Sequence, residues 1–167
     1  MTLRLPLVSV NGKPRQLPPG DTLNAPAPAG SFYLGSNQTI PNTVFTKVLL
    51  DSTLFSAGIS LDAANNRVFP GVGRFLVVMR SDVGSAVDRD YAICAVYKNG
   101  SLYVNGTAGY VSYPGVADLN TIACCIVDVQ SASDYLEFYL YINTGVSGGS
   151  RPLTGGSRYT YMQLLKV

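Results

Sequence analysis

The chain has 167 residues, a length that suits one domain with a short extension, and a formal net charge of only +2. So small a charge, with no run of Lys or Arg, argues against a nucleic acid or an anionic membrane as partner. Charged residues make up 13% of the chain and hydrophobic residues 47%. A surface with so few charges favours coverage by partner proteins.

No apolar run is long enough to span a bilayer, and the first seven residues, Met1-Thr-Leu-Arg-Leu-Pro-Leu, are too short an apolar stretch for a signal peptide. The cysteines Cys94, Cys124 and Cys125 are odd in number, and two are adjacent. This pattern fits reduced, buried thiols better than a disulfide framework. We therefore expect the protein to stay where it is made, or to leave by cell lysis or within a particle.

Residues 1–30 differ in composition from the rest of the chain, because they hold six of the ten prolines. Proline fixes φ and lacks a backbone donor, so this segment should form neither a helix nor a central strand. Its apolar start allows one short strand, which Asn11-Gly12 would turn, and residues 24–30 are typical of an extended linker. We predict an arm that docks on another protein, with a disordered tail as the alternative. The residues assigned to docking are Leu3, Leu5, Leu7, Arg15, Leu17, Asp21 and Leu23.

From residue 31 onward, short runs of strand-forming residues alternate with turn residues, and no segment shows a helical period. The strongest hairpin signal is Asn99-Gly100, and further turns are indicated at residues 65–66, 70–71, 82–84 and 114–115. Many short strands at this spacing predict an all-β sandwich or barrel. The expected strands are 31–35, 43–50, 57–62, 66–69, 72–80, 89–98, 101–105, 109–113, 119–130, 134–143 and 157–166.

Residues 135–142, Tyr-Leu-Glu-Phe-Tyr-Leu-Tyr-Ile, form the most informative of these strands. Side chains alternate between the faces of a strand, so the apolar residues at the even positions form a core stripe, and the opposite face carries Tyr135, Glu137, Tyr139 and Tyr141. A sandwich normally covers one face of each sheet, so the second face predicts contact with another copy of the chain. An exposed tyrosine ladder and a second layer within the same chain are the alternatives. Glu137 needs a partner such as an Arg or a tyrosine hydroxyl, or a position at the solvated end of the interface.

Two further strands, at residues 91–97 and 122–127, are also apolar on both faces. We interpret the three as parts of one sheet that lies between the core and a neighbouring copy. The residues predicted for the interface between copies are Tyr91, Tyr97, Tyr135, Glu137, Tyr139 and Tyr141.

The sequence offers little for catalysis. It has no histidine, which is the commonest general base and metal ligand, and it has no Cys-X-X-Cys, phosphate-binding glycine loop or serine elbow. Two pairs of carboxylates, Asp88 with Asp90 and Asp134 with Glu137, leave a polysaccharide-cleaving enzyme as an option, but solvated loop acids explain them more simply. Asp82, Asp88 and Asp90 lack the dense spacing of a calcium loop. We predict no catalytic residue, no metal and no cofactor.

Four segments follow one another in a characteristic order: Asp62-Ala-Ala-Asn-Asn-Arg-Val-Phe-Pro-Gly-Val-Gly-Arg-Phe-Leu-Val-Val, the strand at 91–97 that continues into Lys-Asn-Gly, the strand at 133–141, and the closing Tyr159-Thr-Tyr-Met-Gln-Leu-Leu. In this order they resemble the complement-q-type globular heads, which belong to the tumour-necrosis-factor-like jelly rolls. The resemblance covers about residues 42–166 and departs from the family pattern at Ser133 and Gln163. It implies a jelly-roll β-sandwich of about ten strands that assembles as a homotrimer, with aromatic residues near the threefold axis.

The arm resembles a second pattern. Asn11-Gly-Lys-Pro-Arg-Gln-Leu-Pro-Pro-Gly-Asp-Thr-Leu is similar to a segment near the start of tailed-bacteriophage fibre and decoration proteins. Together, the two resemblances imply a non-enzymatic virion surface protein that is made in the host bacterial cytoplasm, with residues 1–30 as the arm and 31–167 as the jelly roll.

Two positions on the virion are then open. We favour a capsid decoration, or cement, protein whose arm binds the major capsid protein or other virion proteins, because no collagen-like repeat, coiled coil or long shaft follows the arm. The alternative is a tail-fibre or spike tip that binds a host receptor or a host-surface glycan.

Overall fold

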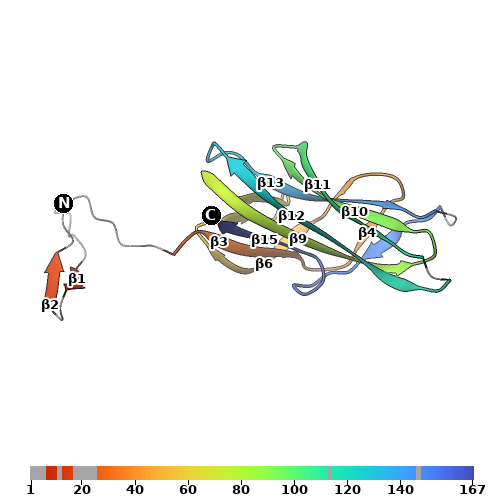
Figure 1. Ribbon diagram of the computed structural model, residues 1–167, viewed down its shortest axis with the longest axis horizontal. Coiled ribbons are helices and arrows are strands. Elements are labelled where there is room, and N and C mark those ends of the chain that lie inside the picture. The colour runs from red at the N-terminus through yellow and green to blue at the C-terminus, as the bar shows by residue number, and fades with distance from the viewer. Residues whose placement is uncertain (1–6, 11–12, 17–25, 113, 146–147) are drawn as a thin grey trace.

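The computed structural model describes residues 7–10, 13–16, 26–112, 114–145 and 148–167. Within these residues every regular element is a β-strand and no helix occurs, so the all-β prediction is confirmed. Figure 1 shows two sheets that pack face to face in a sandwich, with the C-terminus at the end where the chain enters it.

The first sheet has the strand order β11-β10-β13-β8-β7, and β5 also pairs with β13. All its pairs are antiparallel. Its strands are β5 (Thr46–Lys47), β7 (Ser60–Asp62), β8 (Arg67–Phe69), β10 (Tyr91–Lys98), β11 (Ser101–Tyr110) and β13 (Leu136–Asn143).

The second sheet has the order β4-β14-β9-β15-β3-β6, and β12 also pairs with β9. It too is antiparallel throughout. Its strands are β3 (Ala29–Leu34), β4 (Gln38–Ile40), β6 (Leu50–Ala57), β9 (Gly73–Ala86), β12 (Ala117–Val129), β14 (Arg151–Leu153) and β15 (Tyr161–Lys166).

The arm contains a hairpin of β1 (Leu7–Val10) and β2 (Lys13–Gln16), which fits the short turned strand that the sequence predicted. Of the docking residues, Leu7 lies opposite Gln16 and Arg15 lies opposite Val8. The first strand of the sandwich begins at Ala29, just before the expected boundary at residue 31. The remaining docking residues lie outside the described part of the chain: Leu3, Leu5, Leu17, Asp21 and Leu23.

β11 and β9 run well beyond the bounds that the sequence predicted. β11 continues through residues 106–108, and two register shifts against β10 accommodate the irregular pairing. β9 continues to Ala86, through the turn signal at residues 82–84. Its polar residues are tolerated there because they find partners: the Ser81 and Thr121 hydroxyls lie 2.7 Å apart, and the Thr160 hydroxyl accepts a bond from the Asp82 N–H.

The core lies between the two sheets. Leu136, Phe138, Leu140 and Ile142 of β13 are all buried, so the core stripe predicted for this strand is confirmed. The inward face of β10 is buried in the same way, and the second sheet contributes large residues such as Phe32, Phe75, Met79 and Met162. Burying one such side chain stabilises the fold by about 1.5–3 kcal/mol.

Candidate functional site

The outward face of the first sheet holds the six residues that the sequence assigned to an interface. β10 and β13 pair in a register that places Tyr97 opposite Glu137 and Tyr139 opposite Ala95. Since side chains alternate along a strand, this register puts the predicted residues of both strands on the same face. The alternation of side chains along each strand was therefore sufficient to predict that these six residues share one face.

The tyrosine rings of this face contact one another. Tyr97 and Tyr139 stack, with ring centroids 3.9 Å apart and planes inclined by 24°. The Tyr141 ring lies 5.9 Å from the ring of Tyr91 and 5.2 Å from that of Phe45. We call this layer, with Tyr91, Tyr97, Tyr139, Tyr141 and Phe45, the tyrosine face. Burial raises the pKa of Tyr139, and a hydrogen bond with Tyr91 raises that of Tyr141, so both hydroxyls stay protonated at neutral pH.

Glu137 lies beside this layer and is only 2% exposed. Its Oε1 is 2.5 Å from Lys47 Nζ and 3.6 Å from Arg67 Nε, while Oε2 has no hydrogen-bond partner among the described residues. The Arg67 guanidinium carbon sits 4.2 Å from the ring centroid of Tyr135. The arginine partner expected from the sequence is thus present, and Lys47 is added to it. We call Lys47, Arg67 and Glu137 the charged cluster.

Neither cation of the charged cluster was predicted, because both lie far from Glu137 in the sequence. Lys47 reaches it from β5, where it pairs with Tyr139, and Arg67 reaches it from β8. Within one copy, the rings and the cations contact one another on the outward face of the first sheet. Contact of this face with another copy stays a prediction.

The interpretation that all three two-faced strands belong to one sheet is wrong. β12 pairs with β9 in the second sheet, whereas β10 and β13 lie in the first. Ala123 and Val127 of β12 point into the core, but Ile122 and Ile126 point outward and are 49% and 58% exposed. An apolar outward surface therefore exists on the second sheet as well.

This second surface is the more exposed of the two. Leu165, Leu76 and Ile126 form a row of paired residues across β15, β9 and β12, and Phe55 of β6 lies on the same side. Phe55 and Leu165 are 49% and 45% exposed. We call this surface the apolar face; its residues are Phe55, Leu76, Val78, Ile122, Ile126 and Leu165.

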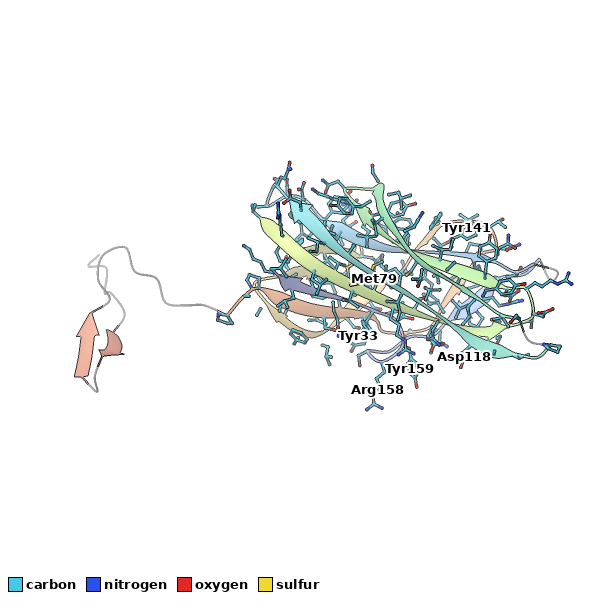
Figure 2. The ribbon with its side chains drawn as sticks, viewed as in Figure 1. Tyr33, Met79, Asp118, Tyr141, Arg158 and Tyr159 are labelled. Carbon is cyan, nitrogen blue, oxygen red and sulfur yellow. The ribbon has the colours of Figure 1, made fainter. Side chains whose placement is uncertain are left out.

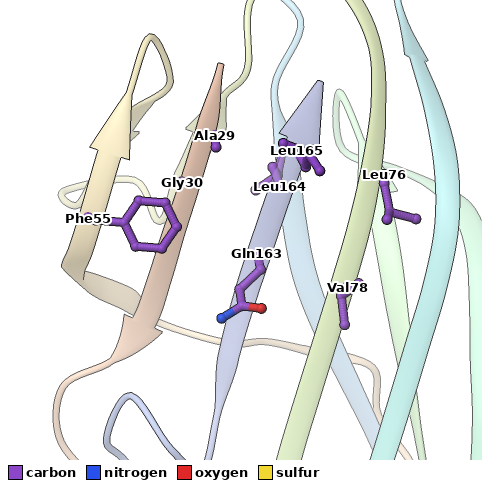
Figure 3. A pocket seen from close by; sticks show the side chains of 8 residues that line it. All are labelled: Ala29, Gly30, Phe55, Leu76, Val78, Gln163, Leu164 and Leu165. Carbon is purple, nitrogen blue, oxygen red and sulfur yellow. The ribbon is translucent and has the colours of Figure 1, made fainter. Parts of the chain in front are cut away.

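A cavity of about 320 Å³ opens in the apolar face between β6 and β9 (Figure 3). Its walls are almost entirely apolar, and Gln163 supplies the one side-chain amide, which lies 3.4 Å from the Ser31 hydroxyl. The cavity is large enough to accept a large side chain from a partner. The remaining lining residues are Ala29, Gly30, Phe55, Leu76, Val78, Leu164 and Leu165.

The carboxylates that were considered for catalysis have structural partners. Asp90 is buried, and its Oδ2 accepts bonds from Arg151 Nε at 2.7 Å and from the Val87 N–H at 3.0 Å. Asp134 accepts a bond from the Asn99 amide, which is the main reason that its pKa falls to about 2. Across the described ranges, no three His, Cys, Asp or Glu residues gather to hold a metal ion, and no helix could cross a bilayer.

No protein-family model matches the chain, and no curated protein matches its sequence. Solved structures match it with a TM-score of 0.58 in three cases: an Eiger TNF from S. frugiperda, murine APRIL at pH 8.0, and the globular domain of zebrafish complement 1qA. In that order, their sequences are 12%, 10% and 12% identical to this chain. The matches cover 86%, 84% and 84% of this chain, and 94%, 98% and 97% of the matched chains. At such identities the likeness shows the fold alone. The sandwich has the jelly-roll fold of tumour-necrosis-factor-like and complement-q-type domains, which confirms the fold that the resemblance implied.

Proposed function

We propose that the protein is a non-enzymatic structural component of a phage particle, a trimeric capsid decoration protein that its N-terminal arm anchors. The exposed apolar face carries the proposal of self-association. The similarity of residues 11–23 to phage fibre and decoration proteins supports a place on the virion. The jelly-roll fold, which the sequence resemblance associates with trimers, supports an assembly of three copies.

The apolar face supports contact with a second copy because nothing in the described part of the chain covers it. Phe55, Ile122, Ile126 and Leu165 each leave nearly half of their surface or more in solvent, and they lie on one side of one sheet. Monomeric soluble proteins keep such patches small. The chain also has few charges with which to oppose association. A trimer would cover this face and fill its cavity with side chains of the next copy.

The tyrosine face is the alternative contact, and it is the one that the sequence alone predicted. On this face the rings already cover one another, and Glu137 already has two cations beside it. A second copy would therefore gain less there than on the apolar face, where the side chains have more exposed surface to bury. We assign the contact between copies to the apolar face.

Cys124 provides a probe of that assignment, because it is exposed on the apolar face between Ile122 and Ile126. The other two thiols should react slowly, since burial raises the pKa of Cys94 and raises that of Cys125 to about 11. We expect a thiol reagent at pH 8 to leave Cys124 unmodified in the assembled protein and to modify it rapidly in a monomeric variant. Equally fast modification of both would show that the apolar face is open to solvent.

The arm supports anchoring through its hairpin. β1 and β2 form a separate sheet of two strands, so in the described part of the chain both outer edges of this hairpin lack a strand partner. A two-stranded hairpin is only marginally stable in water, and an unpaired edge accepts a strand from another protein. A capsid subunit that adds a strand to the hairpin would both hold the arm on the capsid and stabilise the hairpin.

Deleting residues 1–25 should abolish attachment to particles and leave the trimer folded. The sandwich keeps its first strand, which begins at Ala29, and the bond from the Lys166 N–H to the Pro28 carbonyl. Co-sedimentation with particles measures attachment, and sedimentation velocity measures the trimer. Equal attachment of the truncated and full-length proteins would exclude the arm as the anchor.

Electron microscopy of particles that carry the full-length protein tests the rest of the proposal. Density on the capsid surface is the expected result. Density at the tail would identify the alternative, a fibre or spike tip. A full-length protein that attaches to no part of a phage particle would overturn the virion assignment altogether.

A further inference from the structure

The half-buried rings of the tyrosine face are left uncovered by other copies if the trimer forms through the apolar face, and the inference that follows rests on that part of the proposed function. Figure 2 shows Tyr141 of the first sheet on one side of the sandwich and Tyr33, which belongs to β3 of the second sheet, on the other, with Met79 between them. The tyrosine face therefore points away from the proposed contact between copies. It joins two features in one surface, a layer of aromatic rings and the charged cluster beside it.

The aromatic layer is held in place by its own contacts. Tyr97 and Tyr139 stack on each other, and Tyr141 packs between Phe45 and Tyr91. Rings that are already fixed lose little conformational entropy when a ligand covers them. The hydroxyls, which stay protonated, add hydrogen-bonding groups to a surface that is otherwise apolar.

The charged cluster contains an acceptor that the fold leaves unused. Glu137 is almost completely buried, and its Oε2 has no hydrogen-bond partner among the described residues. A buried acceptor without a hydrogen bond is costly, so an acceptor of this kind calls for a partner from outside the fold. Lys47 and Arg67 cover the carboxylate, and their side chains are 26% and 36% exposed. A small outward movement of either flexible side chain would open the carboxylate to a ligand.

We propose that the tyrosine face binds a pyranose ring of a glycan. The C–H face of the sugar stacks on the tyrosine rings, and its hydroxyls bond to the charged cluster. A hydroxyl both donates and accepts, so neighbouring hydroxyls of one sugar can donate to Glu137 Oε2 and accept from Lys47 and Arg67. An apolar surface with a few polar groups at its edge is the usual composition of a small-molecule site.

Other partners fit this surface less well. An extended peptide would need an unpaired strand edge, but β13 has β10 on one side and β5 and β8 on the other. A nucleic acid would need an excess of cations, but Glu137 offsets one of the two here. Asp62 adds a second negative charge nearby: a hydrogen bond from the Asn65 side chain is the main reason that the pKa of Asp62 is lowered, and the charge of Arg67 contributes to it. A glycan needs neither an unpaired strand edge nor an excess of cations.

A glycan array that carries bacterial surface polysaccharides and common oligosaccharides tests this inference with the full-length protein. We expect binding to at least one glycan, and isothermal titration with the bound glycan then compares variants. Tyr141→Ala removes a stacking ring and should weaken binding by about tenfold. Glu137→Gln keeps the shape of the side chain and should weaken it to a similar degree. Tyr159→Ala, which removes an exposed ring elsewhere, should change the affinity by less than about twofold.

The glycan-binding results decide the inference separately from the trimer. No binding to any glycan on the array overturns it, as does a bound glycan whose affinity neither Tyr141→Ala nor Glu137→Gln reduces. Sedimentation of the same samples reports assembly, so a trimer that binds no glycan leaves the proposed function standing. Loss of the trimer in Tyr139→Asp would show that another copy covers this face, and it would also overturn the inference.

Discussion

Substituting Ile126 with aspartate should convert the assembled protein to monomers. Ile126 is 58% exposed in one copy and lies on the apolar face, paired with Leu76 on the neighbouring strand. If a second copy covers it, the new carboxylate loses its hydration without gaining a cation, and the cost is several kcal/mol for each copy. Because each copy in a trimer carries the change, the cost recurs at every contact between copies. Sedimentation velocity at micromolar concentration measures the mass directly.

The matched control places the same charge on the other face. Tyr139→Asp should leave the trimer intact, and Ile126→Val, which keeps an apolar side chain, should do so as well. Circular dichroism shows whether each variant still folds, so a loss of assembly can be separated from a loss of structure. If Tyr139→Asp dissociates the protein and Ile126→Asp does not, the contact lies on the tyrosine face, as the sequence alone predicted.

The faces of individual strands could be predicted from the sequence, because alternation is a local property. β13 buries Phe138 and Leu140 and turns Tyr139 and Tyr141 outward, and β10 follows the same rule. Such a pattern depends only on a period of two residues along one strand. The inward and outward residues of a strand can therefore be predicted without knowing which strands it pairs with.

The sheet to which a strand belongs could not be predicted in this way. β12 has the same two-faced pattern as β10, yet it pairs with β9, whose residues lie about 40 positions earlier in the chain, as the pairing of Ile122 with Arg80 shows. Alternation separates the two faces of β12 without identifying the neighbour on either side. The sequence thus found a second apolar surface in Ile122 and Ile126 but placed it on the wrong sheet.

The partners of Glu137 could not be predicted from the sequence, for a related reason. The residue type predicted a partner such as an Arg or a tyrosine hydroxyl, since a buried carboxylate without one is costly. Lys47 and Arg67 reach it only through the pairing of β5 and β8 with β13, and neither strand is longer than three residues. Strands so short leave almost no alternating pattern from which a register could be inferred.

Gly106→Ala should be among the most destabilising changes in the sandwich. Gly106 lies where β11 crosses close to β12, and a Cβ added there would stand 2.6 Å from Ala123 Cβ, 2.7 Å from the Ile122 carbonyl oxygen and 2.8 Å from Cys94 Sγ. Two of these atoms cannot move unless the backbone moves, so one methyl group must push two strands apart. Overpacking of this kind costs about 1–3 kcal/mol, and the backbone shift should place this variant at the upper end.

Gly84→Ala is the matched control, because its added Cβ would meet nothing closer than 3.6 Å, which is an ordinary contact. Urea unfolding at one fixed protein concentration should show a loss of stability for Gly106→Ala and a change within about 0.5 kcal/mol for Gly84→Ala. Ile122 lies on the apolar face and its backbone is bonded to the Thr107 hydroxyl, so Gly106→Ala should also weaken assembly. Equal stability of the two variants would show that β11 and β12 can separate freely, and the apolar face would then lack the rigid support that a trimer contact requires.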